Sequence, residues 1–261
     1  MSKNNWIIRI VEKSDFMRIV KAYHYAIVMP RITKHYVGCF EGNRLIGGMS
    51  LGWGTQPKKT IQKLFPMLDT IDYLEIGKMV MLDEMPRNSE TQMISLIIKW
   101  IKKNLKIKFL FTWSDGIQGK PGYVYQAANF YYGGFIWTDI YEKNGEKIHP
   151  RSAKPLLIDN AKMIGVDKLF WLTYEYCKKN GIRRIKGKQF RYIYPLNRQA
   201  TKLLKKSTVK WLKKMYPKAV DLVWKIQVAK GKYEILEIKP ELYKNVINVN
   251  HNNVKWALRG V

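Results

Sequence analysis

The sequence of 261 residues contains 47 lysines and arginines against 20 aspartates and glutamates, a formal net charge of +27, and 46% of its residues are apolar. This apolar fraction is enough for a folded core, which excludes a largely disordered chain. Solubility alone needs far less charge, so we interpret the positive excess as a sign of a polyanionic partner, above all nucleic acid.

The expected cellular compartment follows from three negative observations. Neither a long apolar run in residues 1–20 nor an uncharged apolar stretch of about 20 residues is present, so we expect no signal peptide and no membrane-spanning helix. The two cysteines, Cys39 and Cys177, form neither a metal-type pair nor a disulfide framework. We therefore expect a cytoplasmic protein.

The first 145 residues alternate between strand and helix patterns. In chain order we predict a strand (6–12), a helix (14–25), a hairpin (35–54), a strand (73–82), a helix (87–104), a buried strand (107–113), a short helix starting at Gly122 and a strand (135–141). This order predicts an α/β (α+β) fold, with a mixed central sheet flanked by helices.

The second part of the chain is more basic. We predict a helix (166–181), a basic strand or hairpin (183–196), lysine-rich helical segments (198–216) and two short strands (222–228 and 233–238). From Lys147 to Lys225 there are 21 basic and 4 acidic residues, a net charge of 21 − 4 = +17. We expect a catalytic core over 1–150 and a basic C-terminal part over 151–261 that packs on the core and contacts DNA.

The turn at 83–92, DEMPRNSETQ, is the first place where chemistry is expected. Ser89 as N-cap and Gln92 three residues later form a capping-box pattern, and free N–H groups at a helix start bind anions. Arg87 adds a positive charge, and Asn88 and Thr91 are further candidates for a cofactor phosphate. The alternative is an ordinary capped helix.

Ser114 and Asp115 follow the buried strand 107–113, at the carboxyl end where open α/β sheets bind ligands. Asp115 is a candidate general base. The alternative is an aspartate that only stabilises a turn. Glu84 and Asp139 are the next acidic candidates.

A neutral, tyrosine-rich stretch, GKPGYVYQAANFYYGGF, covers 119–135. On a helix starting at Gly122, the side chains of Tyr125, Asn129 and Tyr132 share one face, with Gln126 beside them. Such groups orient a ligand or relay a proton. The alternative is an amphipathic helix with half-buried tyrosines.

The order of elements and these three sites together resemble the GNAT acyltransferase fold. That resemblance implies an acyl donor such as acetyl-CoA or a related compound, whose pyrophosphate rests on a turn of the type Gln/Arg-x-x-Gly-x-Gly/Ala. Here the corresponding residues are Arg87, Glu90 and Gln92, so both glycines are missing and Glu90 adds negative charge.

Four blocks resemble the Mom family of phage DNA-modification proteins: YHY (23–25), LDEMPRNSET (82–91), SDGIQGKPGYVYQAANFYYGG (114–134) and KGKQFRYIYPL (186–196). The resemblance implies transfer of a methylcarbamoyl, glycinamide-like group to the N6 of adenine in DNA, which protects phage DNA from restriction. For a phage protein the compartment is then the host cytoplasm. The alternatives are a GNAT enzyme that acylates a protein or RNA amine, and a non-catalytic nucleic-acid-binding protein.

An enzyme that modifies adenine N6 must flip the base or use single strands, and it holds the base by stacking and hydrogen bonds. The candidates for base binding are Tyr25, Tyr123, Gln126, Asn129 and Tyr132. The basic and aromatic segment supplies the candidates for DNA binding, which are Arg183, Arg184, Lys186, Lys188, Arg191 and Tyr192. His24 and His149 are candidate ligands if a metal is used.

Overall fold

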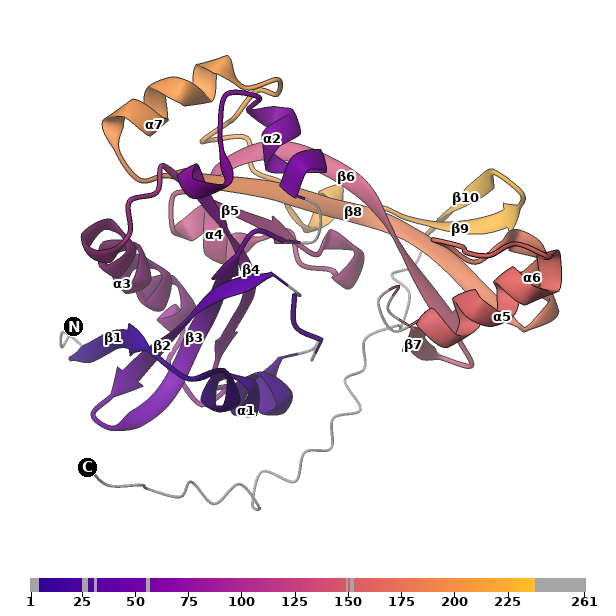
Figure 1. The fold of residues 1–261 in the computed structure, drawn as a ribbon, viewed down its shortest axis with the longest axis horizontal. Helices are drawn as coiled ribbons and strands as arrows, with labels where there is room; N and C mark the ends of the chain where they lie inside the picture. Colours follow the sequence, from indigo (N-terminus) through magenta and orange to yellow (C-terminus); the bar gives the residue numbers. More distant parts are fainter. Residues whose placement is uncertain are drawn as a thin grey trace.

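The computed structural model describes residues 5–24, 28–30, 32–54, 57–148, 150 and 153–237 (Figure 1). Its strands are β1 (Trp6–Ile10), β2 (Thr33–Glu41), β3 (Arg44–Gly52), β4 (Tyr73–Met81), β5 (Phe109–Ser114), β6 (Tyr131–Lys143), β7 (Glu146–Ile148), β8 (Ile182–Pro195), β9 (Trp224–Ala229) and β10 (Lys232–Leu236). Its α-helices are α1 (Lys13–Tyr23), α2 (Ile61–Leu64), α3 (Ser89–Asn104), α4 (Tyr123–Ala127), α5 (Lys154–Ile164), α6 (Tyr174–Lys179) and α7 (Arg198–Leu203). The short 3₁₀ segments η3 (Gly116–Gln118) and η6 (Ala219–Asp221) also matter for the site.

A single mixed sheet organises the molecule. Its strands run in the order β1-β2-β3-β4-β5-β8-β6-β7, and β9 and β10 extend from β8. The β4–β5 pair is parallel, whereas the other pairs are antiparallel. The predicted mixed sheet flanked by helices is confirmed.

Two neighbouring glycines of β3 show how helices cover both faces of the sheet. A Cβ at Gly47 would meet Met93 of α3, while a Cβ at Gly48 would meet Phe16 of α1. Successive strand residues point to opposite faces, so α1 and α3 lie on opposite sides. The main core therefore has two layers of side chains, one under each helix.

The sheet does not divide at residue 150. β8 comes from the basic second part of the sequence, yet it lies between β5 and β6 and pairs with both. Segment 183–196 is thus one long internal strand. β6 and β8 continue beyond the central sheet and carry β7, β9, β10, α5 and α6 at their far end (Figure 1). That end has a small core of its own, which includes Tyr141, Leu172 and Tyr176.

The tyrosine-rich helix is shorter than the sequence suggests. α4 ends at Ala127, Asn129 adopts a left-handed backbone with φ 62°, and β6 begins at Tyr131. An asparagine tolerates this conformation, which ends a helix. The expectation that Tyr132 shares a helix face with Tyr125 is therefore wrong, because Tyr132 lies on a strand.

The start of α3 also differs from the expected capping box. The N-cap is Asn88, with φ 71° and no side-chain cap bond, and Ser89 is the first helical residue and is buried. The prediction that Ser89 caps the helix is therefore wrong by one residue, because Asn88 accepts the left-handed backbone that turns the chain into the helix.

Candidate functional site

The candidate site lies where two parallel strands separate. β4 and β5 pair from Tyr73/Phe109 to Ile76/Thr112 and no further. Beyond that point β4 stays beside β3, as far as the Met81/Gly47 pair. The end of β5 instead pairs with β8 through Ser114. The divergence leaves an opening at the carboxyl end of β5, the position where open α/β sheets bind ligands.

A pocket of about 490 Å³ occupies this opening. Its walls come from 75–81 of β4, from 113–115 at the end of β5, from the loop and helix start at 119–125, and from Tyr23, His24, Pro30, Asp83, Glu90 and Gln189. This volume is in the usual range for small-molecule sites.

Tyr125 lies at the vertex of the two strands. Its hydroxyl is hydrogen-bonded to Thr112, the last residue of β5 that pairs with β4. Its ring packs against Tyr192 and Phe130, with centroids at 5.6 and 5.4 Å. Burial raises the pKa of Tyr125 to about 12, so the hydroxyl stays protonated to a higher pH than that of an exposed tyrosine and can donate a hydrogen bond into the pocket.

The chain before α4 is fixed by close packing. Gly122 has φ 94°, and a Cβ there would lie 2.6 Å from the Tyr192 ring. The Tyr192 hydroxyl donates a hydrogen bond to the carbonyl of Pro121, and Ser114 Oγ donates to the carbonyl of Lys120 at 2.7 Å. Ser114 and Tyr192 therefore hold this loop against the end of β5.

Asp115 is positioned by an amide. Gln189 of β8 donates from Nε2 to Asp115 Oδ1 at 3.0 Å, and both residues line the pocket. Burial lowers the pKa of Lys147 on β7 to about 8, against the raising effect of the Asp115 charge. Asp115 is thus a half-buried carboxylate beside cationic groups, within the same pocket as Tyr125.

Of the residues predicted for catalysis and base binding, the structure brings Ser114, Asp115, Tyr123 and Tyr125 to the pocket, together with the candidate metal ligand His24. Tyr25 and His149 lie outside the described residues.

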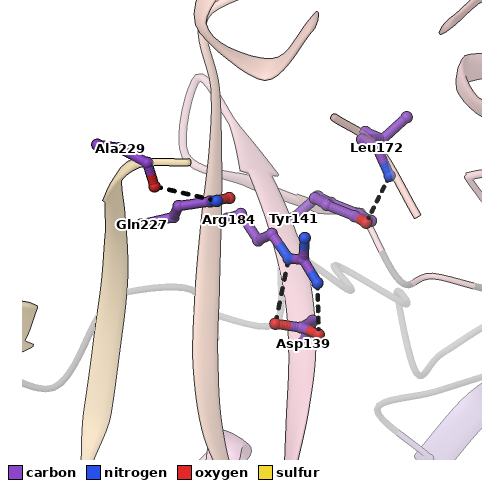
Figure 2. Close-up of polar contacts among 6 residues, drawn as sticks. All are labelled: Asp139, Tyr141, Leu172, Arg184, Gln227 and Ala229. Atoms are coloured by element: carbon purple, nitrogen blue, oxygen red, sulfur yellow. Dashed lines mark hydrogen bonds and ion pairs between the residues drawn. The ribbon is translucent and has the colours of Figure 1, made fainter. Parts of the chain in front are cut away.

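Two other acidic candidates have partners elsewhere. Glu84 is exposed and forms an ion pair with Arg44. Asp139 forms a two-bond pair with Arg184, at 3.2 Å from Nε and 2.9 Å from Nη2. Figure 2 shows this pair on neighbouring strands. The carboxylate of Asp139 therefore forms an ion pair that joins β6 to β8.

The remaining base-binding candidates do not line the pocket. Gln126 donates to the Tyr192 hydroxyl and to the carbonyls of Pro121 and Pro217, and its Oε1 accepts from Lys218. Asn129 lies just after α4 with a left-handed backbone, and Tyr132 pairs with Leu212. Gln126 therefore ties α4 to the segment around 217.

At the start of α3, the residues that line the pocket are acidic. Arg87, Asn88, Ser89 and Thr91 do not line the pocket, whereas Glu90 and the nearby Asp83 do. Carboxylates repel a pyrophosphate. The described residues here do not fit the phosphates of a coenzyme A donor.

The six DNA-binding candidates differ in their availability. Arg183 pairs with Glu142 and Arg184 with Asp139. Tyr192 is fully buried, and Arg191 is half-buried with its pKa lowered by burial. Lys186 and Lys188 are also half-buried, and each lies over an aromatic ring, that of Tyr233 and that of Phe135 respectively.

Sequence reasoning missed several pocket residues, among them Glu75, Lys78 and Gln189. The sequence could have indicated Glu75 and Lys78, because they are charged residues inside the apolar run YLEIGKMVML. Charged side chains are rarely buried in a strand unless they have a partner or a ligand. Glu75 lies against Gly54, where a Cβ would be 2.4 Å from its Oε2. Gln189 gave no such signal, because only strand pairing brings it to Asp115.

Within the described ranges, no group of three or more His, Cys, Asp or Glu side chains is arranged to hold a metal ion. No helix in that part of the chain is long and apolar enough to cross a membrane.

Comparison with known proteins gives one family. Residues 5–218 match the model of the Mom protein family. The chain is 30% identical over 189 residues to the methylcarbamoylase mom of Escherichia phage Mu, which covers 71% of this chain and 73% of that protein.

Solved structures with some likeness are acetyltransferases. An N-acetyltransferase from Staphylococcus aureus Mu50 is 17% identical, with a TM-score of 0.38 over 73% of this chain and 97% of its own. A GNAT family acetyltransferase from Elizabethkingia anophelis, solved with acetyl-CoA bound, is 14% identical, with a TM-score of 0.34 over 74% of this chain and 99% of its own.

Proposed function

The chain belongs to the Mom protein family, and we propose that it is a transferase that attaches a methylcarbamoyl, glycinamide-like group to the N6 of adenine in DNA, protecting the DNA from restriction. The name of the phage Mu relative supports the transferred group, and the +27 charge supports a DNA substrate. A phage protein with this role acts in the host cytoplasm.

One observation carries the proposal: a carboxylate and a protonated tyrosine hydroxyl line the same pocket, Asp115 from the end of β5 and Tyr125 from α4. The adenine N6 amine is a poor nucleophile, because its lone pair is delocalised into the ring. A carboxylate that accepts its proton while the new bond forms contributes typically ~10²–10⁴-fold.

In the proposed transfer step, these two residues accept and supply the protons. The N6 nitrogen forms a bond to the donor carbon, and the bond between that carbon and its leaving atom breaks. The N6 proton passes to the Asp115 carboxylate, and the Tyr125 hydroxyl gives its proton to the leaving atom. Gln189 keeps the Asp115 carboxylate oriented through its 3.0 Å bond.

The base enters the pocket only when it is outside the duplex stack. Tyr123 lies on the rim, half exposed, where its ring is available for stacking. Lys120 and Lys78 supply positive charge to the same walls.

The donor is acetyl-CoA or a related acyl compound in this proposal, and its phosphates lie away from the α3 end of the pocket, because Asp83 and Glu90 repel a pyrophosphate there. The variant Arg87→Ala tests where the phosphates of the donor bind. If they reach Arg87, the KM for the donor is raised in this variant. An unchanged KM indicates that the donor's anionic part lies elsewhere.

Mass spectrometry of nucleosides from the DNA of cells that express the protein tests the function. We expect a modified adenine heavier by the transferred group, absent from cells that express Asp115→Asn. Unmodified DNA together with an acylated protein or RNA would favour the alternative acyltransferase, and no modified product with intact DNA binding would favour a non-catalytic binding protein.

A further inference from the structure

Two large aromatic side chains are exposed on the β6 edge next to the pocket wall. Phe135 and Trp137 are each 39% exposed, and their rings contact edge to face with centroids 5.8 Å apart. They pair with Phe190 and Lys188 of β8, so the two rings lie on the same face of the sheet as those side chains. Contiguous exposed apolar side chains on a folded protein mark interaction sites, whereas single exposed apolar residues need no explanation.

A lysine ammonium group lies over each of these two rings. Lys188 Nζ lies 4.9 Å from the centroid of Phe135, and Lys225 Nζ lies 4.6 Å from that of Trp137. The lysines come from β8 and β9, so strand pairing places them beside the rings. Aromatic faces next to cations are the combination that binds single-stranded nucleic acids, since bases stack and phosphates pair with the charges.

The segment around η6 connects these rings to the pocket rim. Lys188 Nζ donates to the carbonyl of Asp221 at 2.7 Å, and the N–H of Ala219 donates to the Tyr123 hydroxyl at 3.1 Å. Lys218 Nζ lies 5.6 Å from the centroid of the Tyr123 ring, which lines the pocket. Aromatic and lysine pairs therefore continue from the β6 edge to the pocket.

We propose that this aromatic–lysine strip, made of Tyr123, Phe135, Trp137, Lys188, Lys218 and Lys225, binds unpaired nucleotides that flank the target adenine. The inference rests on the proposed function and specifies its substrate as locally single-stranded DNA. Charge complementarity selects the occupant: the three lysines beside the rings belong to the segment 147–225, whose net charge is +17, whereas an apolar protein partner needs no cation over each ring.

The strip also replaces the stacking surface expected from sequence. The aromatics of the basic segment, Phe190 and Tyr192, are buried and cannot stack on bases, and its two leading arginines are paired with carboxylates. The exposed rings instead come from β6, and the basic segment supplies Lys188 beside them.

Fluorescence anisotropy of the full-length protein with three labelled probes tests the strip: a 12-nucleotide single strand, the matching duplex, and the same single strand with abasic sites in place of its bases. The variant is Phe135→Ala with Trp137→Ala. The matched control is Phe170→Ala with Trp171→Ala, which removes two exposed rings before α6 that also have a lysine, Lys168, nearby but have no contact with the η6 segment among those described, so it tests whether position matters. We expect the first variant to lose about 10- to 100-fold in affinity for the single strand, because a base–aromatic stack contributes on this scale, and the control to lose less than about twofold.

The other probes distinguish stacking from charge. Loss of single-strand affinity with little change for the duplex and the abasic strand supports the proposal, as does rescue by Phe135→Tyr with Trp137→Phe, which keeps a ring at each position. Equal losses on all three probes, or no loss on the single strand, overturn it. Circular dichroism confirms that each variant is folded. The assay needs neither donor nor modification, so a protein that fails to modify adenine but passes this test refutes the proposed function and not the strip.

Discussion

At the residue scale, two aspartates of the same sequence have different surroundings. The Asp139 carboxylate accepts two hydrogen bonds from Arg184, whose side chain is 14% exposed (Figure 2). Asp115 accepts a bond from a neutral amide and lies in the pocket wall. The two carboxylates therefore differ in their hydrogen-bond donors, a neutral amide for Asp115 and a guanidinium for Asp139.

Asp115→Asn is expected to lower the modification rate by about 10²–10⁴-fold, since the proposed general base is lost while the shape of the side chain is kept. DNA affinity and thermal stability are expected to stay near those of the unchanged protein. Single-turnover modification followed by mass spectrometry measures the rate. Asp139→Asn is the control, and we expect it to lower Tm because Arg184 loses its partner, while the modification rate stays within a few fold. Full activity in Asp115→Asn would exclude the catalytic role.

Tyr125→Phe removes one hydroxyl from the vertex of β4 and β5. We expect modification to fall by roughly 10²-fold. Because burial raises the pKa of Tyr125 to about 12, the unchanged enzyme is not expected to lose activity through ionisation of this tyrosine near pH 10, where an exposed tyrosine ionises. A pH–rate profile from pH 7 to 10.5 checks both points. A variant with full activity would leave Tyr125 a packing residue only.

At the element scale, α4 has only five residues, and its position depends on the contacts of its ends rather than on helix propensity. Gly122 packs against Tyr192 before the helix, and Gln126 bonds to Pro217 within it. The position of Tyr125 therefore depends on long-range contacts.

Gly122→Ala and Gly145→Ala form a matched pair. Both glycines have positive φ, 94° and 81°, but a Cβ at Gly122 meets the Tyr192 ring at 2.6 Å, whereas one at Gly145 meets nothing within 4 Å. Backbone strain alone costs about 1–2 kcal/mol, so we expect that loss for Gly145→Ala and a clearly larger loss for Gly122→Ala. Urea unfolding measures the difference. Gly122→Ala also lowers activity because α4 shifts, and equal stabilities of the two variants would contradict the close packing.

At the scale of the whole molecule, positive charge is distributed over the basic second half and much of it lies on elements that continue the catalytic sheet. Under the proposed function, DNA that contacts β8 and β9 would lie beside the pocket. The positive charge would then add affinity for any DNA, and the pocket would require an unstacked base.

Binding to a duplex of arbitrary sequence is expected to weaken steeply with salt, with a log–log slope of about −0.9 for each phosphate neutralised. Replacing Lys186 and Lys188 with glutamine is expected to make the slope less steep by roughly 1–2. Binding isotherms between low and physiological salt measure this slope. A slope near zero would mean that charge does not drive binding.

Buried tyrosines predict a loss of stability in alkali. Burial raises the pKa of Tyr73, Tyr125 and Tyr192 above the usual value near 10. Each therefore contributes stability that is complete below about pH 10 and is lost as pH rises through the folded pKa. For Tyr125 the loss amounts to about 2–3 kcal/mol between pH 10 and 12. Urea unfolding across this range measures the loss, and Tyr125→Phe is expected to reduce its slope.

The sequence by itself determined the mixed sheet, the two main covering helices and the family. Apolar periodicity in α3 and the buried run of β5 follow from local residue patterns, which act over a few turns or strand residues. The same reading found Ser114, Asp115, Tyr123 and Tyr125, because a strand end followed by a glycine-bounded element is a recognisable site pattern.

Only the tertiary structure decided which polar groups meet. β8 is separated from β5 by residues 115–181, yet its pairing brings Gln189 to Asp115 and Arg184 to Asp139. It also buried Tyr192, shortened α4 and left Phe135 and Trp137 exposed beside lysines from two other strands. The physical reason is that strand pairing is a non-local interaction, so a residue's cross-strand neighbours are not written in its own segment.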